Sequence, residues 1–332
     1  MSPSPAAGHR WALVLAAGDG ARLQALTTIA AGISVPKQFC SLGGGGSLLN
    51  AALQRARVIA PPARTCVIVA AHHERWWRTL PRSIEARNIV VQPRNRGTAN
   101  GILLPLLQIL HRDPEASLLV LPSDHYVRDE AVLAASLEQV MKETERQRGL
   151  IVLLGFAPEQ ADAELGYIVP SDDRGPGARG VCQFVEKPSG KTAEALIERG
   201  GLWNSFIFAA HGRALLGAFE ERCPEVVGEM RAIVVATNDE ALRQARLAEL
   251  YERLPVLDFS RDIVERCAPR LRVLAVPSCG WSDLGTPGRV AAAVECAPAS
   301  PPTAARAVAQ VHARGVLDLA AQHLRLQQAA AG

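Results

Sequence analysis

The chain has 332 residues, of which 48% are hydrophobic and 21% charged, with 36 Lys and Arg against 33 Asp and Glu. This composition is ordinary for a globular protein and excludes a chain that is disordered throughout. The net charge of +3 is spread along the chain, which excludes the basic stripe that nucleic-acid binding requires but leaves the binding of small anions open.

The seven cysteines are scattered and never occur in C-x-x-C spacing. An odd number without such pairs argues against a zinc site or a disulfide framework and favours a reducing compartment. The apolar runs, for example residues 11–17, are far shorter than the roughly 18 residues that a membrane-spanning helix needs. We therefore expect a soluble, cytoplasmic protein without a membrane partner.

Continuous apolar segments recur in the first half of the chain, at residues 11–16, 66–70, 89–91, 118–121 and 151–154. Runs of this kind are typical of strands that are buried on both faces, as in a parallel sheet covered by helices. Helical patterns lie between them, at residues 47–59, 98–111 and 129–147. Ser47 begins the first of these and is its predicted N-cap. The alternation predicts a doubly wound, mostly parallel α/β sheet.

Beyond residue 155 the pattern changes to shorter segments joined by Gly/Pro-rich turns. We expect strands at 166–170, 180–186 and 203–209, and helices at 192–199, 211–222 and 239–251. These strands would form an inserted β subregion of the same domain, which we place at residues 9–295. A Pro/Ala/Ser stretch at residues 297–303 introduces an Ala-rich end of the chain, and we predict a helical tail over residues 296–332.

A glycine turn, Gly18-Asp19-Gly20, follows Ala16 and Ala17 after the first predicted strand. Glycines at such a place let the main chain approach a phosphate, and the N–H groups there can bind it. The turn is not a dinucleotide-binding fingerprint, because Leu23 stands where the third glycine would be, and no Gly-Lys-Ser/Thr of a P-loop follows. By itself the turn is equally compatible with a simple bend after a strand.

Arg22 and the later run Pro36-Lys37-Gln38-Phe39 place two cations near this turn. The combination of Gly18-x-Gly20-x-Arg22-Leu23 with Pro-Lys-Gln-Phe resembles the signature of the sugar-1-phosphate nucleotidylyltransferases, and is most similar to that of the mannose-1-phosphate guanylyltransferases. The resemblance covers roughly residues 10–295. It implies a Rossmann-like sheet of the GT-A type and catalytic roles for Arg22 and Lys37. It also implies nucleotide binding by Ala16, Ala17, Gly18 and Gly20.

A second motif, Gln92-Pro93-Arg94-Asn95-Arg96-Gly97-Thr98-Ala99, lies where a predicted strand leads into a helix. The resemblance implies that Gln92, Gly97 and Thr98 line the base and ribose of the nucleotide. A polar loop with Thr98 as helix N-cap is the simpler alternative. Gln92 and Gly97 replace the Glu and Asn that are usual in guanylyltransferases, and Gln before Pro is more typical of thymidylyl- and uridylyltransferases. The identity of the base therefore stays open.

Asp124 follows a predicted buried strand, within Leu121-Pro122-Ser123-Asp124-His125, and open α/β sheets bind ligands at the carboxyl ends of their strands. The resemblance implies that Asp124 and Asp283, the latter within Trp281-Ser282-Asp283-Leu284-Gly285, hold Mg²⁺ together with phosphate oxygens. The alternative for either residue alone is a turn or a helix cap. His125 is expected to be a neighbour and not a ligand, because Mg²⁺ prefers oxygen.

Glu186 and Lys187 end an apolar segment, and a solvated strand edge is their simplest explanation. The resemblance implies instead that Glu186 and Asn204 bind sugar hydroxyls, with Gly166 in the sugar-binding loop. It assigns Lys187 to the sugar 1-phosphate. Only four of the 36 basic residues are lysines, and two of them, Lys37 and Lys187, fall where a compact ammonium would meet a phosphate, a role that the larger guanidinium does not duplicate.

The expected reaction is transfer of a nucleoside monophosphate from an NTP to a hexose 1-phosphate, with Mg²⁺ as cofactor and pyrophosphate as second product. GTP and mannose 1-phosphate are the first choice of substrates, and a glucose-1-phosphate uridylyl- or thymidylyltransferase is the nearest alternative. The resemblance allows a homodimer, and the short end of the chain predicts a form without an isomerase domain.

Three other classes are weaker alternatives. A glycosyltransferase usually shows Asp-x-Asp where this chain has Pro-Ser-Asp-His, and a dehydrogenase would need the third glycine of the turn. A non-catalytic regulatory protein that binds nucleotide sugars would not require Arg22, Lys37 and both aspartates together. An enzyme is therefore the favoured prediction.

Overall fold

The computed structural model describes residues 8–28, 32–42, 46–78, 80–81, 83–173, 177–237 and 239–296. The predicted helical tail lies outside these residues except for Cys296. Within the described ranges, every helix is too short or too polar to span a bilayer.

One mixed sheet forms the centre of the described part of the chain, with the strand order β3-β2-β1-β4-β8-β5-β9-β7-β6. Its strands are β1 (Arg10–Ala16), β2 (Thr65–Ala70), β3 (Ile89–Gln92), β4 (Ser117–Pro122), β5 (Ile151–Phe156), β6 (Gly166–Pro170), β7 (Arg179–Val185), β8 (Leu202–His211) and β9 (Leu271–Val276). Strand β9 is absent from the sequence prediction, although its composition is apolar.

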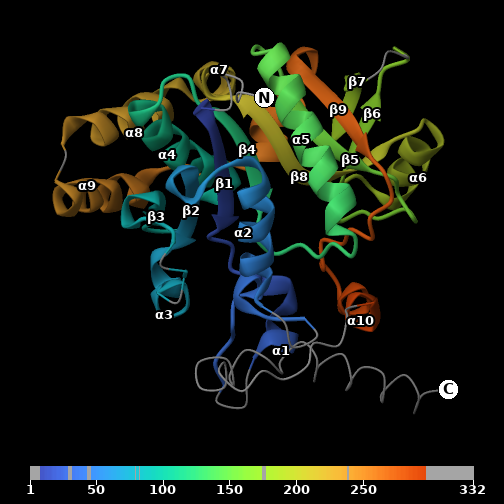
Figure 1. Cartoon of the computed structure of the whole chain (residues 1–332), viewed down its shortest axis with the longest axis horizontal. Coiled ribbons are helices and arrows are strands. Elements are labelled where there is room, and N and C mark those ends of the chain that lie inside the picture. Colours follow the sequence, from blue (N-terminus) through green and yellow to red (C-terminus); the bar gives the residue numbers. More distant parts are fainter. Residues whose placement is uncertain are drawn as a thin grey trace.

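The strands β3, β2, β1 and β4 are parallel neighbours. Residues of β1 alternate between the two faces of the sheet, so Val14 belongs to the core on one face and Leu13 to the core on the other. Helices α2 (Leu48–Ile59) and α5 (Glu130–Arg146) cover the first face, and α4 (Gly97–Arg112) covers the second (Figure 1). This half confirms the predicted helix-covered parallel sheet.

The second half of the sheet corrects the prediction that the sheet is mostly parallel. Strand β8 is antiparallel to both β4 and β5, and β6 and β7 are antiparallel to their neighbours, whereas β5 and β9 are parallel. Because β6 pairs with β8 as well as with β7, the strands β8, β5, β9, β7 and β6 form a closed circuit. This circuit contains the three strands of the predicted β subregion, β6, β7 and β8, and adds β5 and the unpredicted β9 to them. Only eight residues separate the end of β6 from the start of β7, fewer than the dozen or so that a parallel crossover needs, which agrees with the antiparallel pairing of these two strands.

Two predicted helix starts are confirmed in atomic detail. The Ser47 hydroxyl accepts a hydrogen bond from the N–H of Asn50 at the start of α2, and the Asp129 carboxylate accepts one from Val132 at the start of α5. The remaining longer helices are α6 (Gly190–Glu198), α7 (Gly212–Arg222), α8 (Pro224–Ala236), α9 (Glu240–Arg253) and α10 (Pro287–Cys296). Short helices are α1 (Gln24–Thr27) and α3 (Glu74–Trp77), and a π-helical turn spans Phe259–Ile263.

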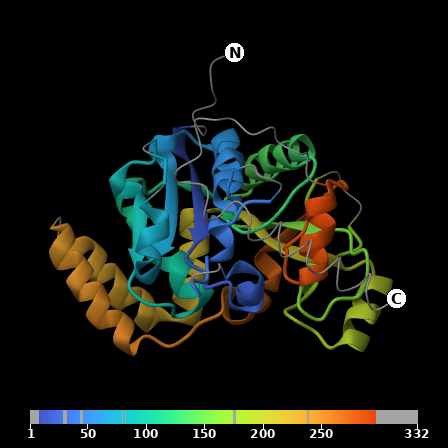
Figure 2. The same ribbon diagram turned by 90° about the horizontal axis from the view of Figure 1, so that it is seen from below.

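Helices α7, α8 and α9 pack with α4 over the second face of the sheet. Figure 2 shows α9 and α6 at opposite ends of the molecule, with the parallel strands and the closed circuit between them. Helix α10 follows the segment that contains Asp283 and packs through Val290 and Ala293 against the first face. The sequence analysis missed both α8 and α10.

Candidate active site

A cleft of about 320 Å³ opens where β1 and β4 end side by side. Ten predicted site residues line it: Gly18, Gly20, Arg22, Thr98, Asp124, Gly166, Glu186, Lys187, Asn204 and Asp283. They come from segments that are far apart in the sequence and meet at one place. Five other predicted residues, Ala16, Ala17, Lys37, Gln92 and Gly97, are not among the residues that line it.

The glycine turn is held in place by Gln38, a buried residue of the Pro-Lys-Gln-Phe run. Its Nε2 donates hydrogen bonds to the main-chain oxygens of Ala16 (3.0 Å) and Gly18 (2.9 Å). The amide of Gln38, which itself lines the cleft, thereby occupies both carbonyl oxygens and fixes the path of the main chain through the turn. The sequence analysis quoted Gln38 within the motif but gave it no role.

Lys37 lies beneath the cleft and not on its surface, with an exposed fraction of only 5%. Its Nζ is 3.1 Å from Oδ2 of Asp124 and also donates a hydrogen bond to the main-chain oxygen of Asp283. One ammonium group therefore connects the two segments that contain the predicted metal ligands. In this position Lys37 contributes positive charge to the carboxylates, and its direct contact with a substrate phosphate stays a prediction.

Both carboxylates are held in the ionised form. Burial opposes ionisation of Asp124, but the positive charge of Lys37 and the hydrogen bond from its ammonium group favour it, and the pKa of Asp124 lies below its ordinary value. Burial likewise opposes ionisation of Asp283, and Arg289 provides the largest compensation, so that its pKa is also lowered. The cleft therefore contains two acidic side chains that stay charged well below neutral pH.

His125 lies beside Asp124 as an uncharged imidazole. Burial is the main cause that lowers its pKa, to about 4. Trp281 Nε1 donates to its Nδ1 at 3.3 Å, so the ring proton is on Nε2, 3.7 Å from Oδ1 of Asp124. At neutral pH the His125 ring therefore contributes no positive charge to Asp124.

Arg289 is a residue of the site that the sequence analysis missed. Its guanidinium group, on α10, donates to Oδ1 of Asp283 and to Oδ2 of Asp162, and the N–H of Gly285 donates to the same Asp283 oxygen at 2.9 Å. Asp162 in turn accepts through its main-chain oxygen from the hydroxyl of Tyr167 in β6. Arg289 therefore connects Asp283 to the segment that leads into β6.

Gly97 and Thr98 contact the chain segment before the π-helical turn. A Cβ at position 97 would lie 2.1 Å from the main-chain oxygen of Leu257, and φ is +85°, so only glycine fits. Thr98 lines the cleft and accepts a hydrogen bond from the N–H of Phe259 through its Oγ1 (2.8 Å). Gln92 is buried and donates to the main-chain oxygen of Arg94 (2.7 Å). Thr98 is thus the member of this motif that faces the cleft.

Gly166, Glu186 and Asn204 form the opposite wall. Gly166 pairs with Asn204 across β6 and β8, and a Cβ at position 166 would lie 2.6 Å from Oε2 of Glu186. The missing side chain therefore gives Glu186 its place beside Asn204. Burial is the main cause that raises the pKa of Glu186, to about 7, and the nearby negative charge of Asp258 adds to it. A carboxyl that changes charge near neutral pH lies in the part of the cleft predicted to bind the sugar.

Three non-glycine residues with left-handed backbone occur among the described residues, and all three are close to predicted site residues. Lys187 (φ 50°) follows Glu186, Leu284 (φ 50°) follows Asp283, and Phe206 (φ 61°) lies two residues after Asn204. Such conformations are unfavourable for L-residues and concentrate at functional sites. The strain supports this cleft as the functional centre.

Comparison with known proteins shows to which family the chain belongs. Residues 11–296 match the profile of the nucleotidyl transferase family. The chain belongs to this family. The solved structure titled mannose-1-phosphate geranyltransferase from Thermus thermophilus is 30% identical and superposes with a TM-score of 0.71 over 86% of this chain and 79% of that chain.

Two curated relatives of this nucleotidyl transferase family member show the same similarity. The mannose-1-phosphate guanylyltransferase of Escherichia coli is 28% identical over 287 residues, and the xanthan biosynthesis protein XanB of Xanthomonas campestris is 29% identical over 280 residues. Each alignment covers 82% of this chain but only 57% of the relative. The chain thus spans little more than half the length of these relatives.

Proposed function

We propose that the protein transfers a nucleoside monophosphate from an NTP to a hexose 1-phosphate and releases pyrophosphate. The observation that supports this most strongly is the single cleft that is bordered by the glycine turn, by Asp124 and Asp283, and by Glu186, Lys187 and Asn204. A phosphate-binding turn and a polar wall suited to a sugar face the same space. Family membership agrees with the reaction type.

In the proposed reaction an oxygen of the sugar phosphate attacks the α-phosphorus of the NTP. A new P–O bond forms, the bond between the α-phosphorus and the bridging oxygen to the β-phosphate breaks, and pyrophosphate leaves with the electron pair. The attacking phosphate is already ionised, so no general base is required. Catalysis then consists of alignment and charge neutralisation, and Arg22 and Lys187, which both line the cleft, supply positive charge for it.

Asp124 and Asp283 are the residues that would hold Mg²⁺. Both offer oxygen ligands, both stay ionised, and both border the cleft, which fits a hard cation that shares its remaining positions with water and phosphate oxygens. When bound, Mg²⁺ supplies positive charge to the phosphate groups. Lys37 supplements this charge from below and holds the two aspartate segments together.

GTP and mannose 1-phosphate are the substrates we propose, in line with the names of the similar proteins. The Gln92-Pro93 pair keeps UTP and dTTP with glucose 1-phosphate as the competing assignment. A cytoplasmic location is supported by the seven cysteines, which are all free. A homodimer stays a prediction, and analytical ultracentrifugation of the whole chain tests it.

The test is a matrix of GTP, ATP, UTP and dTTP against mannose 1-phosphate, glucose 1-phosphate and related sugar phosphates, with release of pyrophosphate as the readout. We expect release only when an NTP, a sugar 1-phosphate and Mg²⁺ are all present, with GTP and mannose 1-phosphate the best pair. Activity with UTP or dTTP and glucose 1-phosphate would establish the alternative. Thermal stabilisation by these ligands without pyrophosphate release would indicate a binding protein and contradict the proposal.

A further inference from the structure

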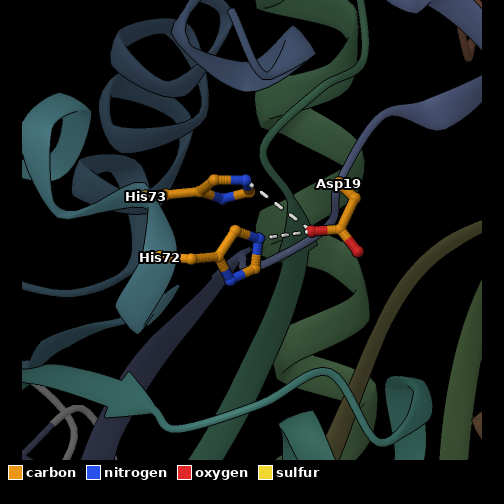
Figure 3. A group of neighbouring side chains, drawn as sticks. All are labelled: Asp19, His72 and His73. Atoms are coloured by element: carbon orange, nitrogen blue, oxygen red, sulfur yellow. Dashed lines mark hydrogen bonds and ion pairs between the residues drawn. The ribbon is translucent and has the colours of Figure 1, made fainter. Parts of the chain in front are cut away.

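A cluster of two imidazoles and one carboxylate lies next to the glycine turn, outside the residues that line the cleft. Nε2 of His72 is 2.8 Å and Nε2 of His73 is 3.6 Å from Oδ1 of Asp19. Figure 3 shows both imidazole rings directed toward the carboxylate of Asp19. Among the described residues, this is the group of three or more His, Cys, Asp or Glu side chains whose potential ligand atoms all lie within 4.8 Å of one another.

The fold brings these residues together at one edge of the sheet. Strands β1 and β2 are parallel and pair Ala16 with Val69, so Asp19 and His72 each lie three residues beyond this pair. The strand ends before the histidines, and the 3-10 turn Ala71–His73 replaces it. In a strand, consecutive side chains would point to opposite faces, whereas this turn directs both rings to the same side, with their centroids 4.0 Å apart.

An ion pair between Asp19 and His72 explains only part of the cluster. His73 is 6% exposed, its Nδ1 has no hydrogen-bond partner among the described residues, and its Nε2 is too far from Asp19 for a hydrogen bond. A buried imidazole nitrogen without a hydrogen-bond partner is costly, and the ion pair of Nε2 with Asp19 at 3.6 Å leaves room for another group between them. Because burial disfavours its protonated form, the ring is available as a neutral ligand.

We propose that Asp19, His72 and His73 bind a divalent transition-metal ion, with Zn²⁺ as the representative. A tetrahedral zinc ion with bonds of about 2.0–2.2 Å separates its ligand atoms by about 3.3 Å, and the two distances from Asp19 bracket this value. Imidazole nitrogen favours zinc and its neighbours over Mg²⁺. Three protein ligands leave a fourth position for water or a phosphate oxygen.

A neighbouring side chain orients the carboxylate as metal sites require. Asn95 Nδ2 donates to Oδ2 of Asp19 at 3.0 Å, and the N–H of Gly97 donates to Oδ1 of Asn95 at 3.1 Å. The second carboxylate oxygen is thus occupied, and Oδ1 remains directed at the histidines. Partners of this kind orient metal ligands and contribute to affinity. Gly18 and Gly20, on either side of Asp19, line the cleft, so the ion would fix the turn to the end of β2.

The test is calorimetric titration of ZnCl₂ into the full-length protein in buffer with excess Mg²⁺, which competes with Zn²⁺ for the carboxylate pair in the cleft. We expect one zinc ion per chain. Asp19→Asn and His73→Asn should each weaken the affinity at least about 100-fold, and Asn95→Ala about 10-fold, because loss of an orienting partner costs 10–100-fold. Replacing Zn²⁺ by Co²⁺ should give the intense visible absorption of tetrahedral coordination. This inference does not depend on the proposed reaction.

The chain offers a matched control in His9. His9 pairs with Asp113 at 2.7 Å and its side chain is 49% exposed. His72 is similar, because it pairs with Asp19 at 2.8 Å and its side chain is 52% exposed. Among the described residues, however, no second histidine joins the pair of His9 and Asp113. The His9→Asn variant should bind zinc with the affinity of the wild type. The His72→Asn variant should bind zinc more weakly, and we expect it to fold because the side chain is half exposed. Equal affinity of His72→Asn and wild type, equal losses in both variants, or no stoichiometric zinc binding by the wild type would overturn the proposal.

Discussion

One terminal nitrogen of Arg289 donates a hydrogen bond to Oδ1 of Asp283, and the other donates to Oδ2 of Asp162. The same Asp283 oxygen also accepts a hydrogen bond from the N–H of Gly285. The side chains of these three charged residues are at most 17% exposed. The guanidinium group, which cannot lose its charge, therefore fixes the direction of the Asp283 carboxylate and connects it to the segment before β6. Arg289 acts as a positioning residue for the predicted metal ligand.

We expect Arg289→Met to reduce kcat by about 10–100-fold, because a displaced ligand misaligns the reacting groups, and to raise the Mg²⁺ concentration at half-maximal rate. The variant should also lose about 3 kcal/mol of unfolding free energy, since it leaves two buried carboxylates without their partner. Arg289→Lys should restore part of both. Rates of pyrophosphate release against Mg²⁺, with denaturant unfolding, provide the measurement. An unchanged Mg²⁺ dependence in Arg289→Met would show that Arg289 is structural only.

Asp124→Asn should reduce the rate of pyrophosphate release at least about 100-fold, because it removes one of the two proposed metal ligands. The fold should persist, since the amide has the same shape as the carboxylate. The matched control is Asp172→Asn, which changes an exposed aspartate that does not line the cleft and should keep the wild-type rate. Near-normal turnover of Asp124→Asn would exclude its assignment as a metal ligand.

The raised pKa of Glu186 predicts that both the stability of the protein and its binding of the sugar 1-phosphate depend on pH. Its pKa is raised to about 7, chiefly by burial, so the folded state binds its proton more tightly than the unfolded chain, where the ordinary value is 4.5. The stability due to this proton is complete below about pH 4.5 and is lost as the pH rises through 7. Glu186→Gln keeps a neutral group, so its melting temperature should rise relative to the wild type over this interval.

The same titration should affect the substrate. An ionised Glu186 accepts hydrogen bonds from sugar hydroxyls more strongly than the neutral acid, so KM for the sugar 1-phosphate should fall as the pH rises through about 7. Comparing the profiles of wild type and Glu186→Gln separates this effect from the titration of the sugar phosphate itself. Parallel profiles of the two proteins would contradict the assignment of Glu186 to the sugar.

Gly166→Ala should raise KM for the sugar 1-phosphate about tenfold while KM for the NTP changes little. The new Cβ would lie 2.6 Å from Oε2 of Glu186, so the carboxylate must move away from Asn204, and loss of one good hydrogen bond to a charged group accounts for such a factor. Gly217→Ala is the matched control, because a Cβ there meets nothing within 4 Å inside α7. It should keep the kinetics and stabilise the helix slightly.

Two substitutions of Lys187 distinguish the effect of its left-handed backbone strain from the effect of its positive charge. Lys187→Gly and Lys187→Ala both remove the ammonium group and should raise KM for the sugar 1-phosphate to a similar extent. At φ 50° alanine retains the left-handed strain and glycine does not, so Lys187→Gly should be more stable than Lys187→Ala by about 1 kcal/mol. Kinetics and thermal unfolding of the two variants test this, and a higher stability of the alanine variant would contradict it.

Local patterns predicted the parallel half of the fold well, because each segment there contains its own signal. The caps Ser47 and Asp129 and the apolar strand runs are readable within a few residues of sequence. The direction of β8 is set instead by pairs such as Ser117 with His211, which are distant in sequence. The expectation of a mostly parallel sheet failed at this point.

The site residues likewise divide into those with a local sequence signal and those placed by contacts between distant segments. Motif residues such as Gly18, Asp124 and Glu186 meet in one cleft as the resemblance implied, although their roles stay predictions. Arg289 belongs to no motif, and its partner Asp162 is 127 residues away. The burial of Lys37 beneath the aspartates depends on the packing of three separate segments. Such positions follow from tertiary structure and have no local signal.

Strand β8 belongs to both halves of the sheet at once. Leu202–Asn204 pair with β6, Phe208–His211 pair with β4 of the parallel half, and β5 pairs with both stretches. The left-handed residue Phe206 lies where the partner changes. The two walls of the cleft are therefore one piece of hydrogen-bonded sheet and not two bodies joined by a hinge. Any closure around substrates would therefore involve side chains such as Arg22 and Glu164, which both line the cleft and form an ion pair at 3.2 Å.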